Sequence, residues 1–218
     1  MEILLIRHGE TAWNRERRMQ GHIDIPLNEE GQRQARALGA ALAAERPDAI
    51  WSSDLQRARD TAQAVADAHD LPVQLDAELR ERCYGAFEGM TYQEIAEHYP
   101  EAMRQWKSRE PHARFPAGER DAETLQEFHQ RCVGAATRIV RRHQAGKTVI
   151  VAHGGVLDCL YRAATGMALE AERNFGNANA AINRLRWDGA RFSLLQWGDE
   201  THLAAAGLDE IDRFHPAP

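Results

Sequence analysis

The chain has 218 residues, of which 43% are hydrophobic and 28% are charged. At about 150 residues per domain this length fits one large domain, and such a chain buries roughly 70% of its unfolded surface, which excludes disorder over most of its length. The excess of 33 acidic over 27 basic residues, a net charge of −6, excludes the broad cationic surface on which non-specific nucleic-acid binding depends.

The cysteines and the N-terminal residues exclude further classes of protein. Cys83, Cys132 and Cys159 are far apart and odd in number, which predicts reduced thiols and neither a disulfide framework nor a thiolate metal site. The apolar run at residues 3–6 is too short for a signal peptide or a membrane span. We therefore expect a cytoplasmic protein that does not bind a membrane.

Strands and helices alternate in the first 75 residues. Short β-branched apolar runs predict buried strands, and apolar residues at helical spacing predict helices. In chain order, these elements are a strand at residues 3–6, a helix at 28–44, a strand at 48–52, a helix at about 54–69 and a strand at 72–75. Asn28 is the expected N-cap of the first helix, and Ser53 or Asp54 is the expected N-cap of the second.

The middle of the chain, at about residues 83–121, breaks this alternation. It contains three prolines and an interrupted helical pattern, which predict a lid-like helical insertion within a single domain spanning residues 1–218. Regular elements then return as a helix at 124–143, a strand at 148–152, a helix after His153 and a hairpin of residues 181–187 and 192–197. The residues after His202 are expected to form a surface arm.

These elements predict an α/β fold with three layers, α/β/α. Apolar strands separated by helices predict a mostly parallel central sheet with helices on both faces, and the final hairpin adds an antiparallel edge strand. Ligands bind at the carboxyl ends of the strands in such sheets. Two strands run into a His-Gly turn, at residues 7–9 and 153–155, so parallel pairing of these strands would bring His8 and His153 to one edge.

Two histidines beside arginines suit phosphoryl transfer. A neutral imidazole has a lone pair that accepts a phosphoryl group near pH 7. The charge on the phosphoryl oxygens calls for converging cations with forked geometry, and Arg7 and Arg57 are the leading candidates. Metal binding is the weaker interpretation, because no His-x-x-x-His or Asp-rich spacing occurs and Arg7 would repel a divalent cation.

The opening Leu-Ile-Arg-His-Gly-Glu-Thr, at residues 5–11, resembles the signature of the histidine phosphatase superfamily, the phosphoglycerate mutase-like enzymes. Four later blocks are similar to this family in the same order. They lie at residues 20–27, 52–62, 79–89 and 151–155. The resemblance therefore runs from residue 3 to about residue 197, nearly the whole chain.

The resemblance implies two kinds of site residue. The implied catalytic residues are His8, the nucleophile that forms a phosphohistidine, Glu81, the general acid and base, and Arg7, Arg57 and His153, which hold the phosphoryl oxygens. The implied substrate-binding residues are Asn14, Gln20 and Gly154, the last through its backbone N–H. Glu78 and Glu88 stay open as alternatives to Glu81.

We therefore expect a metal-independent, acid-type phosphomonoesterase that hydrolyses a small phosphorylated metabolite and needs no cofactor. The mutase branch has a lysine soon after the Glu-Gly step and a paired arginine, whereas Glu88 and Gly89 are followed here by Met-Thr-Tyr. A cofactor-dependent phosphoglycerate mutase and a phospholigand-binding protein without catalysis are the alternatives. The sequence does not identify the substrate, and it is compatible with a homodimer.

One block departs from the family pattern. The family has Pro-x-Gly-Glu-Ser before the long helix, where this chain has Pro-Ala-Gly-Glu-Arg at residues 116–120. Glu123, four residues after Glu119, fits the spacing to Arg131 better. The sequence leaves open which of these two glutamates lies near the site.

Overall fold

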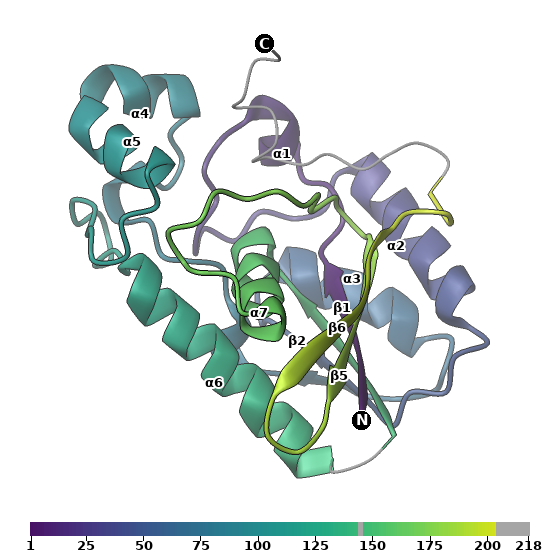
Figure 1. The fold of residues 1–218 in the computed structure, drawn as a ribbon. Helices are drawn as coiled ribbons and strands as arrows, with labels where there is room; N and C mark the ends of the chain where they lie inside the picture. Colours follow the sequence, from purple (N-terminus) through teal and green to yellow (C-terminus); the bar gives the residue numbers. More distant parts are fainter. Residues whose placement is uncertain (144–145, 204–218) are drawn as a thin grey trace.

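A six-stranded sheet organises residues 1–143 and 146–203, which are the residues that the computed structural model describes. Its strands, in the spatial order β3-β2-β4-β1-β5-β6, are β1 (Glu2–Arg7), β2 (Ala49–Ser52), β3 (Val73–Leu75), β4 (Lys147–Ala152), β5 (Ile182–Trp187) and β6 (Phe192–Asp199) (Figure 1). The first four strands run parallel, and β5 and β6 add the antiparallel edge. The expected arm after His202 falls on residues 204–218, outside the described residues.

Helices cover both faces of this sheet and confirm the three-layer prediction. One face carries α6 (Leu125–His143) and α7 (Gly154–Thr165), and the other carries α2 (Glu29–Leu42) and α3 (Gln56–Ala66) (Figure 1). Successive residues of β1 divide between the two cores: Ile3 and Leu5 pack with α6 and α7, whereas Leu4 and Ile6 pack with α2 and α3. Because both faces are buried, this strand is apolar at every one of these positions.

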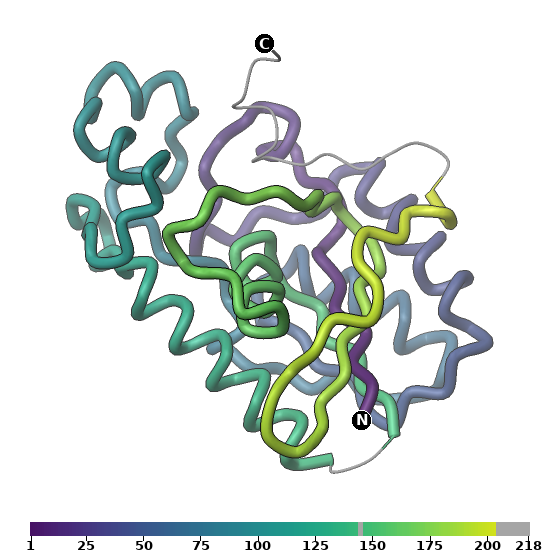
Figure 2. The backbone as a smooth tube through the Cα atoms, in the orientation of Figure 1, coloured from purple at the N-terminus to yellow at the C-terminus, as the bar shows by residue number. Residues whose placement is uncertain are grey.

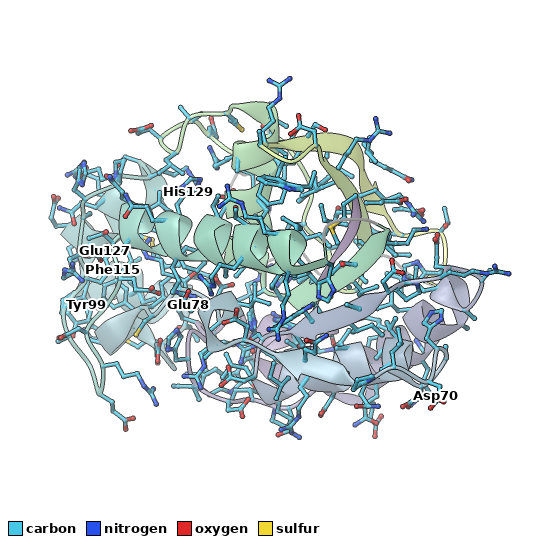
Figure 3. All side chains as sticks on the ribbon, turned by 90° about the horizontal axis from the view of Figure 1, so that it is seen from below. Asp70, Glu78, Tyr99, Phe115, Glu127 and His129 are labelled. Atoms are coloured by element: carbon cyan, nitrogen blue, oxygen red, sulfur yellow. The ribbon has the colours of Figure 1, made fainter. Side chains whose placement is uncertain are left out.

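The predicted insertion folds as two short helices with an apolar cluster of their own. α4 (Tyr92–His98) and α5 (Pro100–Lys107) lie away from the sheet (Figure 1). Phe87 and Phe115 are buried in this cluster, and Figure 3 shows Phe115 at the end of the molecule where α6 begins. Pro100 occupies the first turn of α5, where a missing N–H removes no helical hydrogen bond, so this proline starts a helix.

The helix after β2 begins later than predicted. Its N-cap is Leu55, which makes no side-chain cap, so the prediction of Ser53 or Asp54 at this position is wrong. The carboxylate of Asp54 instead accepts two hydrogen bonds from Arg80, at 2.7 and 2.6 Å. The two residues of this ion pair are 26 positions apart in the sequence. Helix-capping preferences consider only neighbouring residues, so they do not predict that Asp54 pairs with Arg80.

The structure also contains a short helix that the hydrophobic pattern does not predict, α1 (Ala12–Glu16). Thr11 is its N-cap and forms a reciprocal capping box with Asn14. Five residues are too few for a helical period to emerge, and only the capping pair marks the helix in the sequence. Two single turns of 3₁₀ helix, at Ala77–Leu79 and Gly85–Phe87, flank Glu81.

Candidate active site

The two His-Gly turns meet at one edge of the sheet. β1 and β4 are parallel neighbours in which Arg7 is paired with Ala152, so His8 and His153 follow at the same level. The backbone N–H of His8 donates to the carbonyl of Ala152 at 3.0 Å. The two imidazole rings lie edge to face with their centroids 5.1 Å apart.

His8 is held in one tautomer. Its Nδ1 lies 2.7 Å from the carbonyl oxygen of Gly9. A carbonyl oxygen only accepts, so Nδ1 carries the proton and Nε2 of the neutral ring keeps its lone pair. Burial lowers the pKa of His8 well below that of an exposed imidazole, and the charges of Arg57 and Arg7 lower it further. His8 therefore presents a neutral, nucleophilic nitrogen at pH 7.

His153 lies against His8 at the N-cap of α7. Its side chain is fully buried, and neither ring nitrogen has a hydrogen-bond partner within the part of the chain that the structure describes. Burial lowers the pKa of His153 well below the usual range, and Arg57 and His8 add to this effect. Because buried polar atoms are normally paired, these two nitrogens make His153 a candidate for contact with a bound ligand.

We expect the protein to lose stability as the pH falls below about 6.5. The native-state pKa values of His8 and His153 lie well below those of the unfolded chain, so the unfolded state takes up protons that the native state does not. The free energy of unfolding then falls by about 1.4 kcal/mol per pH unit for each additional proton that the unfolded state binds. Urea denaturation at about pH 7.5 and about pH 5.5 measures this, and His153→Asn should make the dependence shallower. Equal unfolding free energies at the two pH values would contradict the prediction.

Main-chain carbonyls orient the two arginines. Arg57 is fully buried in the first turn of α3 and donates Nη1 to Ile23 O at 2.9 Å and Nη2 to Gly21 O at 2.8 Å. Arg7 donates Nη1 to Asn177 O at 2.6 Å. A guanidinium held in this way keeps its charge and its forked geometry, and it loses little rotamer freedom when it binds an anion.

Two backbone N–H groups fix the carboxyl group of Glu81. Its Oε1 accepts from Arg82 N at 2.8 Å, and its Oε2 accepts from Gly155 N at 2.9 Å. A Cβ at Gly155 would lie 2.2 Å from Glu81 Oε1, so only glycine permits this approach. Of the two competing carboxylates, Glu78 is exposed, and Glu88 accepts from the backbone N–H groups of His22 and Tyr84. Glu81 is the carboxylate that reaches the site.

A small cavity of about 20 Å³ opens between these groups. It is lined by Arg7, His8, Met19, Gln20, Gly21, Arg57, Glu81 and Tyr84. Five of the eight predicted site residues are among them. The other three do not line it: His153 lies against His8, Asn14 lies in the capping box of α1, and Gly154 lies at the start of α7. Sequence reasoning did not single out Met19 or Tyr84 for the site.

A segment for which the sequence predicted no helix, and a strand only at its last residue, links several of these groups. Residues 166–181 connect α7 to β5, and Figure 2 shows this segment, green, arching over α7. The amide Nδ2 of Asn177 donates to Gly154 O at 2.7 Å, and that of Asn179 donates to His8 O at 2.8 Å. Sequence reasoning missed both residues. Their only signal is their residue type, because asparagine side chains often bond to nearby backbone in turns.

The structure decides between Glu119 and Glu123. Glu119 is exposed, whereas Glu123 forms a two-pronged ion pair with Arg131, at 2.6 and 2.7 Å. Nη2 of Arg131 also donates to the carbonyl of Glu81, at 3.1 Å. Glu123 is therefore linked to the peptide of Glu81 through Arg131.

Within residues 1–143 and 146–203, no three His, Cys, Asp or Glu side chains are grouped as metal ligands would be. In the same ranges, none of the helices combines the length and the apolar character that crossing a bilayer requires.

Comparison with known proteins identifies the family of this chain. The model of the histidine phosphatase superfamily (branch 1) matches residues 3–200. Phosphoglycerate mutase-like protein 4 of Arabidopsis thaliana is 38% identical over 210 residues, which cover 95% of this chain and 89% of that protein. The metal-independent phosphoserine phosphatase of the same plant is 35% identical over an alignment that covers 95% of this chain and 85% of that protein.

The solved structure of YhfR from Bacillus stearothermophilus has the same fold. It superposes with a TM-score of 0.85 at 35% identity, covering 92% of this chain and 98% of that one. The similarity in sequence and in structure thus extends over nearly the full length of this chain. The chain belongs to the histidine phosphatase superfamily.

Proposed function

We propose that this protein is a metal-independent phosphomonoesterase that hydrolyses small phosphorylated metabolites through a phosphohistidine on His8. The observation that carries the proposal is the state of His8: a buried, neutral imidazole whose Nδ1–H is anchored to Gly9 O and whose Nε2 keeps its lone pair. Arg7 and Arg57 line the same cavity and supply the positive charge that a phosphoryl group requires. The phosphatase name of one relative supports the same reaction class.

The first step transfers the phosphoryl group to the enzyme. His8 Nε2 attacks phosphorus, the bond from phosphorus to the ester oxygen breaks, and the carboxylic acid of Glu81 gives its proton to the leaving oxygen. Arg7 and Arg57 hold the phosphoryl oxygens while negative charge spreads over them. His153, which is fully buried against His8, is the further residue assigned to contact with these oxygens.

The second step releases inorganic phosphate. Glu81, now a carboxylate, takes a proton from a water molecule, and that water attacks the phosphorus of phospho-His8. The nitrogen-phosphorus bond breaks, and His8 and the acid form of Glu81 are restored. Gln20, Asn14 and the backbone N–H of Gly154 bind the substrate in both steps. Gln20 lines the cavity, which supports its assignment most directly.

The cations of the insertion favour a phosphatase over a mutase. A mutase must hold a second phosphate or a carboxylate of its substrate and so needs further available cations. In this chain Arg104 pairs with Glu101 at 2.7 Å and Arg114 pairs with Glu127. Both guanidinium groups therefore already have a carboxylate partner.

The test is phosphate release from a panel of small phosphomonoesters, with and without a chelator. We expect release from several members of the panel, at a rate that the chelator does not change, because the described residues offer no grouped metal ligands. Conversion of 3-phosphoglycerate to 2-phosphoglycerate, stimulated by 2,3-bisphosphoglycerate, without phosphate release would identify a mutase. Binding of phosphoesters without turnover would identify a ligand-binding protein.

A further inference from the structure

One short loop contacts two residues of the proposed site, Arg57 and the general acid Glu81. Residues 20–24 follow α1, and the carbonyls of Gly21 and Ile23 accept the two hydrogen bonds that orient Arg57. His22 lies between these two residues, and its Nε2 is 2.8 Å from the carbonyl oxygen of Glu81. Because a carbonyl oxygen has no proton, His22 Nε2 is the donor.

The carbonyl of Glu81 is thus held from two sides. Arg131 supplies the second donor, at 3.1 Å, and is itself fixed by its ion pair with Glu123. The carboxyl oxygens of the same residue are held by Arg82 N and Gly155 N. Both ends of Glu81, its peptide and its carboxyl group, therefore have fixed hydrogen-bond partners.

The loop that carries His22 is itself closely packed. The backbone N–H of His22 donates to Glu88 Oε1 at 2.9 Å. Gly21 has φ +51°, a conformation that favours glycine, and a Cβ there would lie 2.1 Å from the same Glu88 oxygen. The main chain of His22 is therefore fixed with respect to the loop of residues 81–88. Burial lowers the pKa of the His22 ring, which keeps the ring neutral at pH 7.

We propose that His22 is a positioning residue. The Nε2–H group of His22 holds the peptide of Glu81 at a fixed distance from the guanidinium group of Arg57. This inference rests on the proposed function, in which Glu81 protonates the leaving oxygen. General acid catalysis requires the acid and the leaving oxygen within hydrogen-bond reach, and a displacement of about 1 Å costs up to about 10²-fold in rate. Loss of the His22 donor removes one of the two side-chain contacts described for this carbonyl and keeps the longer one, from Arg131.

The test compares two substrates of similar size and different leaving groups. p-Nitrophenyl phosphate releases a stable anion that needs little protonation, whereas phenyl phosphate releases a more basic oxygen that depends on the acid. For His22→Leu we expect kcat/KM for phenyl phosphate to fall by about tenfold or more, and that for p-nitrophenyl phosphate by less than about threefold. A purely structural role would lower both values equally.

A conservative variant at His22 and a control at a different histidine extend the experiment. His22→Gln places an amide donor near the position of Nε2 and should restore both rates to within about twofold of the wild type. His129→Leu removes another half-buried histidine, which Figure 3 shows on α6 on the side away from Glu78, and should leave the ratio of the two rates unchanged.

Glu81→Gln separates this inference from the proposed function. It should depress phenyl phosphate hydrolysis selectively, by about 10²-fold. If Glu81→Gln does so and His22→Leu lowers both rates equally or neither, the role of His22 is overturned alone. If Glu81→Gln shows no selective loss, or the wild type hydrolyses neither substrate, the proposed function and this inference are both overturned.

Discussion

Replacing His8 with alanine should reduce phosphate release by about 10⁴-fold or more, the largest effect of any single substitution in this protein. The substitution removes the only atom that bonds to phosphorus in the proposed reaction. The residual arginines can still bind a phosphate, so binding of inorganic phosphate should persist. This contrast between binding and turnover identifies a nucleophile rather than a binding residue.

The covalent intermediate gives a second measurement of the same prediction. Rapid quenching of the wild type during turnover of a radiolabelled ester should trap a label that is stable in base and labile in acid, as phosphohistidine is. The His8→Ala variant should trap none. Its thermal unfolding must stay cooperative, because His8 is buried and its loss leaves a small cavity. Turnover that survives in His8→Ala, or a label on serine or a carboxylate, would end the proposal.

Arg57→Ala should give the second largest effect, a fall in kcat/KM of about 10² to 10³-fold. Arg57 is fully buried, and two carbonyls fix its guanidinium before any substrate arrives. Such a preorganised cation stabilises the charge that spreads over the phosphoryl oxygens in the transition state. Arg57→Lys keeps the charge and loses the fork, so it should recover only part of the rate.

Arg59 provides the matched control for Arg57. It lies two residues further along α3, its side chain is 48% exposed, and its nearest carboxylate is Asp60 at 3.7 Å. Arg59→Ala should change kcat/KM by less than about twofold, because exposed ion pairs contribute little. Steady-state kinetics and urea denaturation should be measured for both variants. Arg57→Ala also removes the donor to the carbonyls of Gly21 and Ile23, which can lower stability. Equal activity of the two variants would contradict the role given to Arg57.

The order and type of most elements could be predicted from the sequence because each depends on local pattern. The apolar run that became β4, Lys147–Ala152, and the 3.6-residue period of α6, Leu125–His143, are examples. The meeting of His8 and His153 could also be predicted, because it requires only that two strands ending in His-Gly run parallel. The start of α3 could not be predicted, because Asp54 pairs with Arg80.

The supporting contacts of the site were not predictable in the same way. Asn177 lies 170 residues from Arg7, and nothing in its own neighbourhood predicts that its carbonyl accepts the Arg7 guanidinium. The choice of Glu123 over Glu119 likewise depended on where the chain places Arg131. Contacts of this kind depend on the packing of several elements at once and leave no periodic pattern in the chain.

The sequence by itself determined which chemistry is available: two histidines and two arginines at strand ends and helix starts, in a mostly parallel α/β chain. Only the tertiary structure decided the condition of those groups. It buried His8 beside two cations, fixed its proton on Nδ1, and held the carboxyl group of Glu81 with two backbone N–H donors. The physical reason is that residue type and spacing are local properties, whereas pKa, tautomer and orientation depend on neighbours that folding brings from distant parts of the chain.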